Sequence, residues 1–112
     1  MAAQTSAKSL LIIEDEEEFL EIVSENLTAR GFRVQGTPKA KEGILRAKNQ
    51  KYDLIICDIN LGAVSGKDVI MAIRTDKSGF NLKSPIIVMS GSLDADTVKE
   101  IRPHVQGVVV KP

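Results

Sequence analysis

Short apolar runs that end in polar side chains constrain the fold of this chain more than any other feature. The run at 54–57 is entirely apolar, and the carboxylate of Asp58 follows it at once. Such a run is typical of a strand that is buried on both faces, as in a parallel sheet. In open sheets of this kind, ligands bind at the carboxyl ends of the strands. The sequence therefore predicts that Asp58 lies at a functional edge of a sheet.

Three further apolar runs end in polar residues, and segments of helical periodicity separate them. The runs and the residues after them are 10–13 with Glu14 and Asp15, 85–89 with Ser90, and 107–110 with Lys111. An alternating segment at 32–35 predicts a shorter strand. Helices are predicted from the acidic run at 14–18 to Gly31, from Thr37 and Pro38 to the polar run at 48–51, over 67–74 and over 94–101.

This alternation of strands and helices predicts an α/β fold, a doubly wound five-stranded parallel sheet with right-handed crossovers. The length of 112 residues suits one domain. We expect a flexible lead-in at 1–9 and a single domain at 10–112. No helical segment follows the last strand, so we expect the final helix to be lacking and one face of the sheet to be under-covered.

Composition excludes several classes of function. The formal net charge is zero and tryptophan is absent, so no basic surface indicates binding to nucleic acid. The single cysteine, Cys57, excludes an internal disulfide and is expected to be a small core residue. The apolar run at 10–13 is too short to span a membrane, and we expect a cytoplasmic protein without a membrane partner.

The predicted sheet brings the polar residues at its strand ends together. Three carboxylates at one edge, those of Glu14, Asp15 and Asp58, repel one another, which raises a pKa or requires a cation. Oxygen ligands of this type suit Mg²⁺ together with a phosphate oxygen. Ser90 and Lys111 could hold the remaining oxygens of a phosphoryl group. Asp58, the central carboxylate, is the candidate nucleophile that would form an aspartyl phosphate.

In these features the chain resembles the receiver domain of two-component response regulators, from residue 10 to residue 112. Each mark is weak by itself, but all of them occur in order on the expected elements. The resemblance implies a flavodoxin-like (CheY-like) fold with strand order 2-1-3-4-5. The marks are the acidic pair Glu14 and Asp15, the acceptor Asp58, Gly66 eight residues later, Ser90 with Gly91, and Lys111 with Pro112.

The resemblance also implies a function and a role for each of these residues. Asp58 would accept a phosphoryl group from a histidine kinase or a histidine phosphotransfer protein, in a Mg²⁺-dependent reaction that switches an output surface. The domain would assist its own phosphorylation and dephosphorylation without being a turnover enzyme. The implied metal ligands are Glu14, Asp15, Asp58 and the backbone carbonyl of Asn60; Ser90 and Lys111 would contact the phosphoryl group, and Asn60, Gly91 and Ser92 would set phosphate lifetime and access.

Two departures from the family pattern affect the predicted output. Val108 stands where receivers carry a switch aromatic, so the usual rotation of a ring cannot operate there. Gly62 replaces a common proline, which predicts a more mobile loop. Without a final helix, the strand at 108–110 would be an exposed edge. Either the chain is a fragment of a longer protein, or a partner or a second copy, in a homodimer, covers the face left bare.

Other interpretations remain open at this point. A non-switching pseudo-receiver could act as an interaction or dimerisation module. A phosphohydrolase of the haloacid dehalogenase type also forms an aspartyl phosphate, but its nucleophile follows the first strand, with a second aspartate where this chain has Asn60. A flavodoxin-like nucleotide binder is disfavoured because the first loop is acidic. Away from the site, Lys67 and Arg74 are predicted to be surface cations, and Phe80 and Leu82 to pack onto the body.

Overall fold

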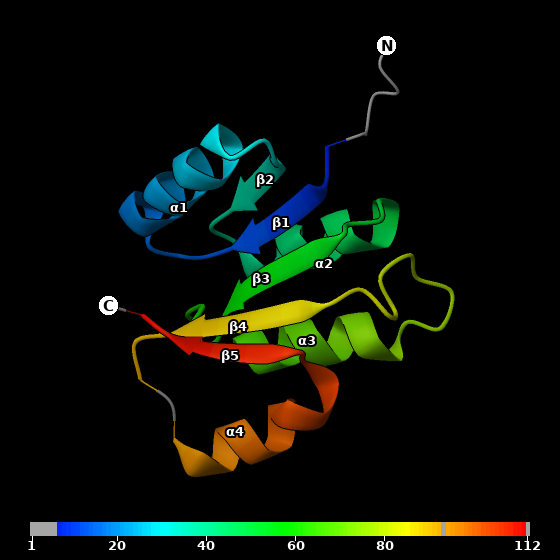
Figure 1. Ribbon diagram of the computed structural model, residues 1–112. Coiled ribbons are helices and arrows are strands. Elements are labelled where there is room, and N and C mark those ends of the chain that lie inside the picture. The colour runs from blue at the N-terminus through cyan, green and yellow to red at the C-terminus, as the bar shows by residue number, and fades with distance from the viewer. Residues whose placement is uncertain (1–6, 93, 112) are drawn as a thin grey trace.

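A five-stranded parallel sheet forms the centre of the computed structural model, which describes residues 7–92 and 94–111 (Figure 1). The strand order is β2-β1-β3-β4-β5, which confirms the predicted topology. The strands are β1 Ser9–Ile13, β2 Arg33–Thr37, β3 Leu54–Asp58, β4 Ile86–Ser90 and β5 Gly107–Val110. The helices are α1 Glu17–Ala29, α2 Ala40–Asn49, α3 Gly66–Thr75 and α4 Ala95–Ile101, with a 3₁₀ turn at Arg102–His104.

The main core lies between the sheet and the helices α2, α3 and α4. Leu11 and Ile13 of β1 and Ile55 and Cys57 of β3 are fully buried on this face. Alternate residues of the same strands face the other side, where Ile12 is also fully buried. Strands buried on both faces explain why these runs are continuously apolar rather than alternating.

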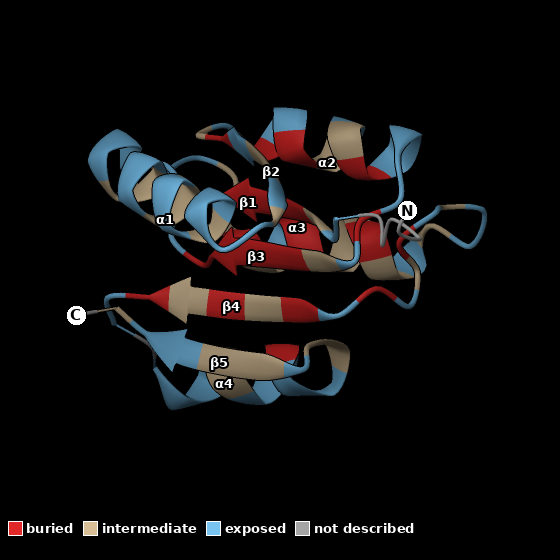
Figure 2. Ribbon diagram, turned by 45° about the horizontal axis from the view of Figure 1, so that its top comes forward, coloured by how far each residue is buried: buried red, intermediate tan, exposed pale blue. Residues whose placement is uncertain are grey.

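The opposite face of the sheet is covered less completely. Helix α1 packs mainly along β1 and β2, and none of its residues is fully buried. No helix follows β5 within the described residues, and Figure 2 shows that the C-terminal half of β5 is exposed. Val109 is 49% exposed and Val110 is 65% exposed. The expectation of an under-covered face therefore agrees with the structure.

The two predicted boundaries around β2 had different outcomes. Helix α1 ends at Ala29, and Gly31 stops it as predicted, since the Gly31 φ of 97° suits glycine and Phe32 N–H donates to Leu27 O at 3.1 Å. The prediction that Thr37 caps α2 is wrong, since Thr37 is the last residue of β2. Its carbonyl accepts a hydrogen bond from Glu14 N–H, and this pairing with the end of β1 keeps it extended. Helix α2 starts three residues later, at Ala40.

Arg74 is not the surface cation that the sequence predicted. Its guanidinium donates to the backbone carbonyls of His104 at 2.8 Å, Asn81 at 3.1 Å and Leu82 at 3.0 Å. Burial lowers the pKa of this group. Leu82 is partly buried as expected, but Phe80 is 57% exposed, so its predicted packing is wrong. Arg74 thus joins α3 to the segment before β4 and to the turn before β5.

Asn81 is a buried structural residue that the sequence did not reveal. Its Nδ2 donates to the carbonyls of Ala47 at 2.6 Å and Gln50 at 2.8 Å. Its Oδ1 accepts from Tyr52 N–H at 2.8 Å and from the Ser84 hydroxyl at 2.9 Å. Asn81 therefore fastens the connection between α3 and β4 to the end of α2 and the start of β3.

The ends of the chain bear on two predictions. Residues 1–6 of the predicted lead-in lie outside the described residues, and Ser9, its last residue, already belongs to β1. Within residues 7–92 and 94–111, no helix is both long enough and apolar enough to cross a bilayer.

Candidate functional site

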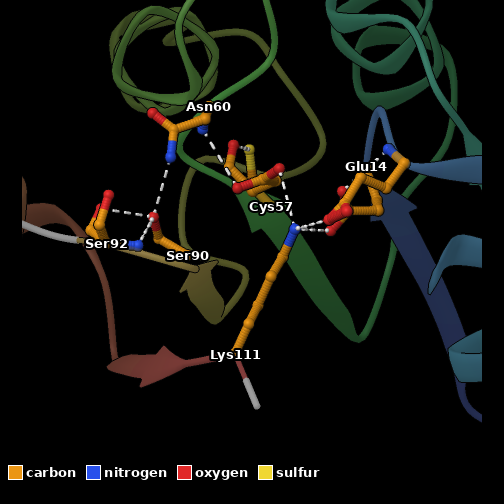
Figure 3. A network of polar contacts seen from close by, with 8 residues as sticks. Glu14, Cys57, Asn60, Ser90, Ser92 and Lys111 are labelled. Carbon is orange, nitrogen blue, oxygen red and sulfur yellow. Dashed lines mark hydrogen bonds and ion pairs between the residues drawn. The ribbon is translucent and has the colours of Figure 1, made fainter.

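The carboxyl ends of four strands bring the predicted site residues to one edge of the sheet (Figures 1 and 3). Glu14 directly follows β1, Asp58 ends β3, Ser90 ends β4 and Lys111 directly follows β5. All four strands run in parallel, so their last residues come to the same side. Glu14, Asp58 and Ser90 are between 0% and 2% exposed, which is unusual for polar residues and indicates that each has specific partners.

Three carboxylates form the acidic part of this edge. Oxygen atoms of Glu14, Asp15 and Asp58 lie within 4.8 Å of one another, with Asp15 exposed and the other two buried. Burial raises the pKa of Glu14, and the contact with the Lys111 ammonium opposes this shift. Glu14 Oε2 accepts from Glu16 N–H at 3.0 Å, whereas the buried Oε1 has an ion pair but no well-aligned hydrogen bond among the described residues.

The ammonium group of Lys111 lies among these acids. Its Nζ is 2.8 Å from Glu14 Oε1, 3.2 Å from Asp58 Oδ2 and 3.3 Å from Glu16 Oε1. It also lies 4.9 Å from the centre of the Phe19 ring, within the range of a cation–π contact. Burial by itself lowers the pKa of Lys111, but the hydrogen bonds with Glu14 and Asp58 outweigh it and raise the pKa. The lysine is therefore charged and partly neutralises the acidic cluster.

Ser90, Asn60 and Ser92 form a second polar group beside Asp58 (Figure 3). The Ser90 hydroxyl accepts from Asn60 Nδ2 at 3.1 Å and donates to Ser92 O at 2.7 Å. Asn60 also donates its backbone N–H to Asp58 Oδ1 at 3.1 Å. Asn60 therefore contacts both the central carboxylate and the hydroxyl group.

An open cleft of about 280 Å³ gives access to these groups. A side chain at Gly91 would meet no other atom within 4 Å, so this wall of the cleft is unobstructed. Every predicted site residue except the fully buried Glu14 and Ser90 lines the cleft. The lining residues are Asp15, Glu16, Asp58, Asn60, Gly91, Ser92 and Lys111.

The donor set fits a hard divalent cation. Carboxylate oxygens are the ligands that Mg²⁺ prefers, and Mg²⁺ usually takes one or two of them together with water and phosphate oxygens. The buried Glu14 Oε1, which lacks a well-aligned hydrogen bond within the described residues, is the kind of atom that a cation would satisfy. The residues at this edge therefore fit Mg²⁺.

Two residues near Lys111 were not recognised as part of the site from the sequence. Both fall within the helix predicted from the acidic run at 14–18 to Gly31, and neither directly follows an apolar run. The structure places both against the lysine ammonium. Only tertiary packing brings them there, since 95 positions separate Glu16 from Lys111.

Comparisons with known proteins agree with this geometry. A family model described as the response regulator receiver domain matches residues 10–112. The cell cycle transcriptional regulator CtrA of Caulobacter vibrioides is 35% identical over 104 residues, which is 92% of this chain and 43% of CtrA. The sensor histidine kinase AruS of Pseudomonas aeruginosa is 30% identical over 112 residues, 99% of this chain and 11% of AruS. The chain thus spans less than half the length of these relatives.

Solved structures show the same architecture. The chemotaxis protein CheY4 of Vibrio cholerae superimposes with a TM-score of 0.85 at 23% identity, over 95% of this chain and 88% of CheY4. That likeness supports the fold alone. The response regulator TrrA of Thermotoga maritima, solved in complex with Mg²⁺ and beryllium fluoride, has a TM-score of 0.81 and 25% identity over 94% of this chain and 87% of TrrA.

Proposed function

Because the chain belongs to the response regulator receiver domain family, we propose that it is a phosphoacceptor of two-component signalling and that Asp58 takes the phosphoryl group. The observation that carries this proposal is the position of Asp58. Its carboxylate is 2% exposed at the end of β3, and it lines an open cleft together with Lys111 and Asn60. A buried acid that is reachable from one side and paired with a cation suits a nucleophile.

The proposed reaction is a direct phosphoryl transfer. A carboxylate oxygen of Asp58 forms a bond to phosphorus as the bond from phosphorus to a partner's histidine nitrogen breaks, and that nitrogen keeps the electron pair. Transfer of this kind depends mainly on positioning and on neutralisation of charge. Lys111 would supply positive charge beside Asp58, from which its Nζ is 3.2 Å away. Ser90 would donate its hydroxyl proton to a phosphoryl oxygen of the product.

The residues that would hold Mg²⁺ are Glu14, Asp15, Asp58 and the backbone carbonyl of Asn60. When bound there, the cation would offset the negative charge of the phosphoryl oxygens. A solved relative supports this proposal, since the response regulator TrrA was solved in complex with Mg²⁺ and beryllium fluoride. The ion pair between Glu14 and Lys111 is the contact with which Mg²⁺ would compete.

The partner that supplies the phosphoryl group would be a histidine kinase or a histidine phosphotransfer protein. The match to part of a sensor histidine kinase, AruS, supports a place within such a relay. We propose a switch rather than a turnover enzyme. New contacts of Ser90 and Lys111 with the phosphoryl group would shift a pre-existing equilibrium of the neighbouring loops and so change an output surface.

The decisive experiment is intact-mass analysis after incubation with acetyl phosphate and Mg²⁺. We expect the unchanged protein to gain one phosphoryl group, and Asp58→Asn to gain none, because the amide is not a nucleophile. The matched control is Asp53→Asn, just before the opposite end of the same strand, which should be modified like the unchanged protein. The Mg²⁺ proposal predicts that a chelator prevents the modification.

An unmodified protein that still binds Mg²⁺ would contradict the proposal. That result would favour a non-switching interaction module, for which Val108 is the supporting feature. Val108 lies at the position of the switch aromatic and packs against the main core as a small, partly buried residue.

A further inference from the structure

The Ser90 hydroxyl has no bonding capacity left in this structure. It is fully buried, and it accepts hydrogen bonds from Asn60 Nδ2 at 3.1 Å and from Ser92 N–H at 3.2 Å. It donates its one proton to Ser92 O at 2.7 Å. A serine hydroxyl can donate one hydrogen bond and accept two, so all three positions are filled.

These hydrogen bonds keep the Ser90 hydroxyl from donating to a phosphoryl group on Asp58. To donate to a phosphoryl oxygen on Asp58, Ser90 must first give up its bond to the carbonyl of Ser92. Two of its three hydrogen bonds are made with the backbone of Ser92, which lies in the exposed segment after β4. The third comes from Asn60, on a different strand end. Asn60 is therefore the side chain, among the described residues, that fixes the Ser90 hydroxyl in its orientation toward Ser92.

We propose that the side-chain amide of Asn60 is a positioning residue that holds the Ser90 hydroxyl toward Ser92 in the resting protein. Asn60 thereby sets how readily Ser90 turns to a phosphoryl group. This inference rests on the proposed function and deepens it. The contact between Asn60 and Ser90 acts before phosphorylation, and its role is therefore separate from any effect of Asn60 on hydrolysis of the phosphate.

Two features of the surroundings support movement at this contact. A cavity of about 170 Å³, lined by Asn60, Ser92 and Thr97 among other residues, lies between the segments after β3 and β4. A β-carbon at Gly91 would meet no atom within 4 Å, so the segment between Ser90 and Ser92 is open on the side of Gly91.

The size of the effect follows from the energy of one hydrogen bond. A typical intramolecular hydrogen bond changes an equilibrium by about two- to tenfold after its competition with water is counted. Loss of the Asn60 amide should therefore shift the balance of Ser90 orientations by about that factor. The shift should appear without metal or phosphate, because the contact belongs to the resting state.

The test compares Asn60→Ala with Ser92→Ala by NMR on the metal-free, unphosphorylated protein. Proton couplings at the Ser90 β-carbon report its rotamer, and hydrogen exchange at the Ser92 amide reports its bond to the Ser90 hydroxyl. We expect Asn60→Ala to give averaged couplings and about two- to tenfold faster exchange at Ser92. Ser92→Ala is the matched control, because Ser92 joins the network only through its backbone. A single, unchanged Ser90 rotamer in Asn60→Ala would overturn the inference.

Beryllium fluoride with Mg²⁺ provides a second readout that links the contact to the switch. If Asn60 stabilises the resting state, Asn60→Ala should bind this phosphoryl analogue about two- to tenfold more tightly than the unchanged protein does. Weaker binding, with the rotamer averaged, would overturn the link between the contact and the switch. Failure of the unchanged protein to bind the analogue would count against the proposed function, whereas the metal-free couplings would still decide the inference about Asn60.

Discussion

Gly66 has no reactive side chain, but the backbone at the end of β3 packs directly against it. A β-carbon at this position would lie 2.6 Å from the α-carbon of Ile59 and closer still to the carbonyl oxygen of Asp58. Both are backbone atoms, so no side-chain rotation could relieve the overlap. The Gly66 amide donates to Ile59 O at 2.8 Å, which holds the start of α3 against the segment that carries Asp58.

We therefore expect Gly66→Ala to lower the free energy of unfolding by about 1–3 kcal/mol, as overpacking does elsewhere. Urea denaturation measures this change. Gly91→Ala is the matched control, since a β-carbon at Gly91 meets nothing within 4 Å, and it should change stability by less than about 0.5 kcal/mol. Equal effects of the two substitutions would show that the close approach at Gly66 has no energetic cost.

Individual residues differ in how far the sequence reveals their place. Asp58, Ser90 and Lys111 could be assigned to one edge because each follows an apolar run, and parallel strands end on the same side. Their roles in phosphoryl transfer stay predictions until the modification of Asp58 is measured. The contact of Phe19 with Lys111 could not be predicted, because helical spacing shows only which face of α1 is apolar and not which ammonium lies over the ring.

At the scale of elements, prediction succeeded for segments with a periodic pattern and failed between them. Each strand and helix was identified, because apolar runs and helical spacing are local signals. Thr37 was misplaced because its parallel pairing with Ile13 outweighs its preference for a helix cap. Arg74 and Asn81 were missed because their partners are backbone carbonyls of distant segments, which leave no pattern in the sequence.

Asn81 gives the connection between α3 and β4 its own testable contribution to stability. Asn81→Ala would leave the carbonyls of Ala47 and Gln50 and the N–H of Tyr52 without this partner. We expect the free energy of unfolding to fall by about 2–4 kcal/mol, since unpaired buried polar groups are costly. Thermal or urea unfolding measures the change.

The control for Asn81 is Asn26→Ala. Asn26 is an exposed asparagine in α1 with one hydrogen bond, to Ile22 O, and its replacement should change stability only slightly. A small effect at both positions would mean that water replaces the contacts of Asn81. Asp58 should remain open to modification in the folded fraction of Asn81→Ala, because the side chain of Asn81 bonds no site residue among those described and contacts Tyr52, just before the other end of β3.

The molecule as a whole should lose stability as the pH becomes alkaline. Burial raises the pKa values of Cys57 and Tyr52, and ion pairing raises that of Lys111 against the effect of its burial. The folded protein therefore keeps protons that the unfolded chain releases, beginning with the cysteine at about pH 8.5. These three groups should add no pH dependence below that pH, and above it stability should fall by up to about 1.4 kcal/mol per pH unit for each group.

Urea unfolding at several pH values, compared with Cys57→Ala, tests this expectation. The substitution should lower stability at neutral pH and flatten the curve between about pH 8.5 and 10, where cysteine titrates before the other groups. Parallel curves for the two proteins would show that Cys57 ionises with equal ease in the folded and the unfolded chain.

Coverage of the sheet is unequal at the scale of the molecule. Helices α2, α3 and α4 enclose the main core, whereas α1 covers part of the opposite face and Val109 on β5 is half exposed. An exposed edge strand can pair with another chain. The homodimer through this face stays a prediction, which sedimentation at increasing concentration would test.

Lys111 has a further consequence for how the protein is made. It follows Glu14, Asp15 and Asp58 in the chain and is therefore translated after them. If β1 pairs with β3 in the nascent chain before Lys111 emerges, the acids come together without the ammonium group and repel one another. Lys111 can partly neutralise them only once β5 has docked beside β4. The strands that carry the acids are therefore synthesised before the lysine that partly neutralises them.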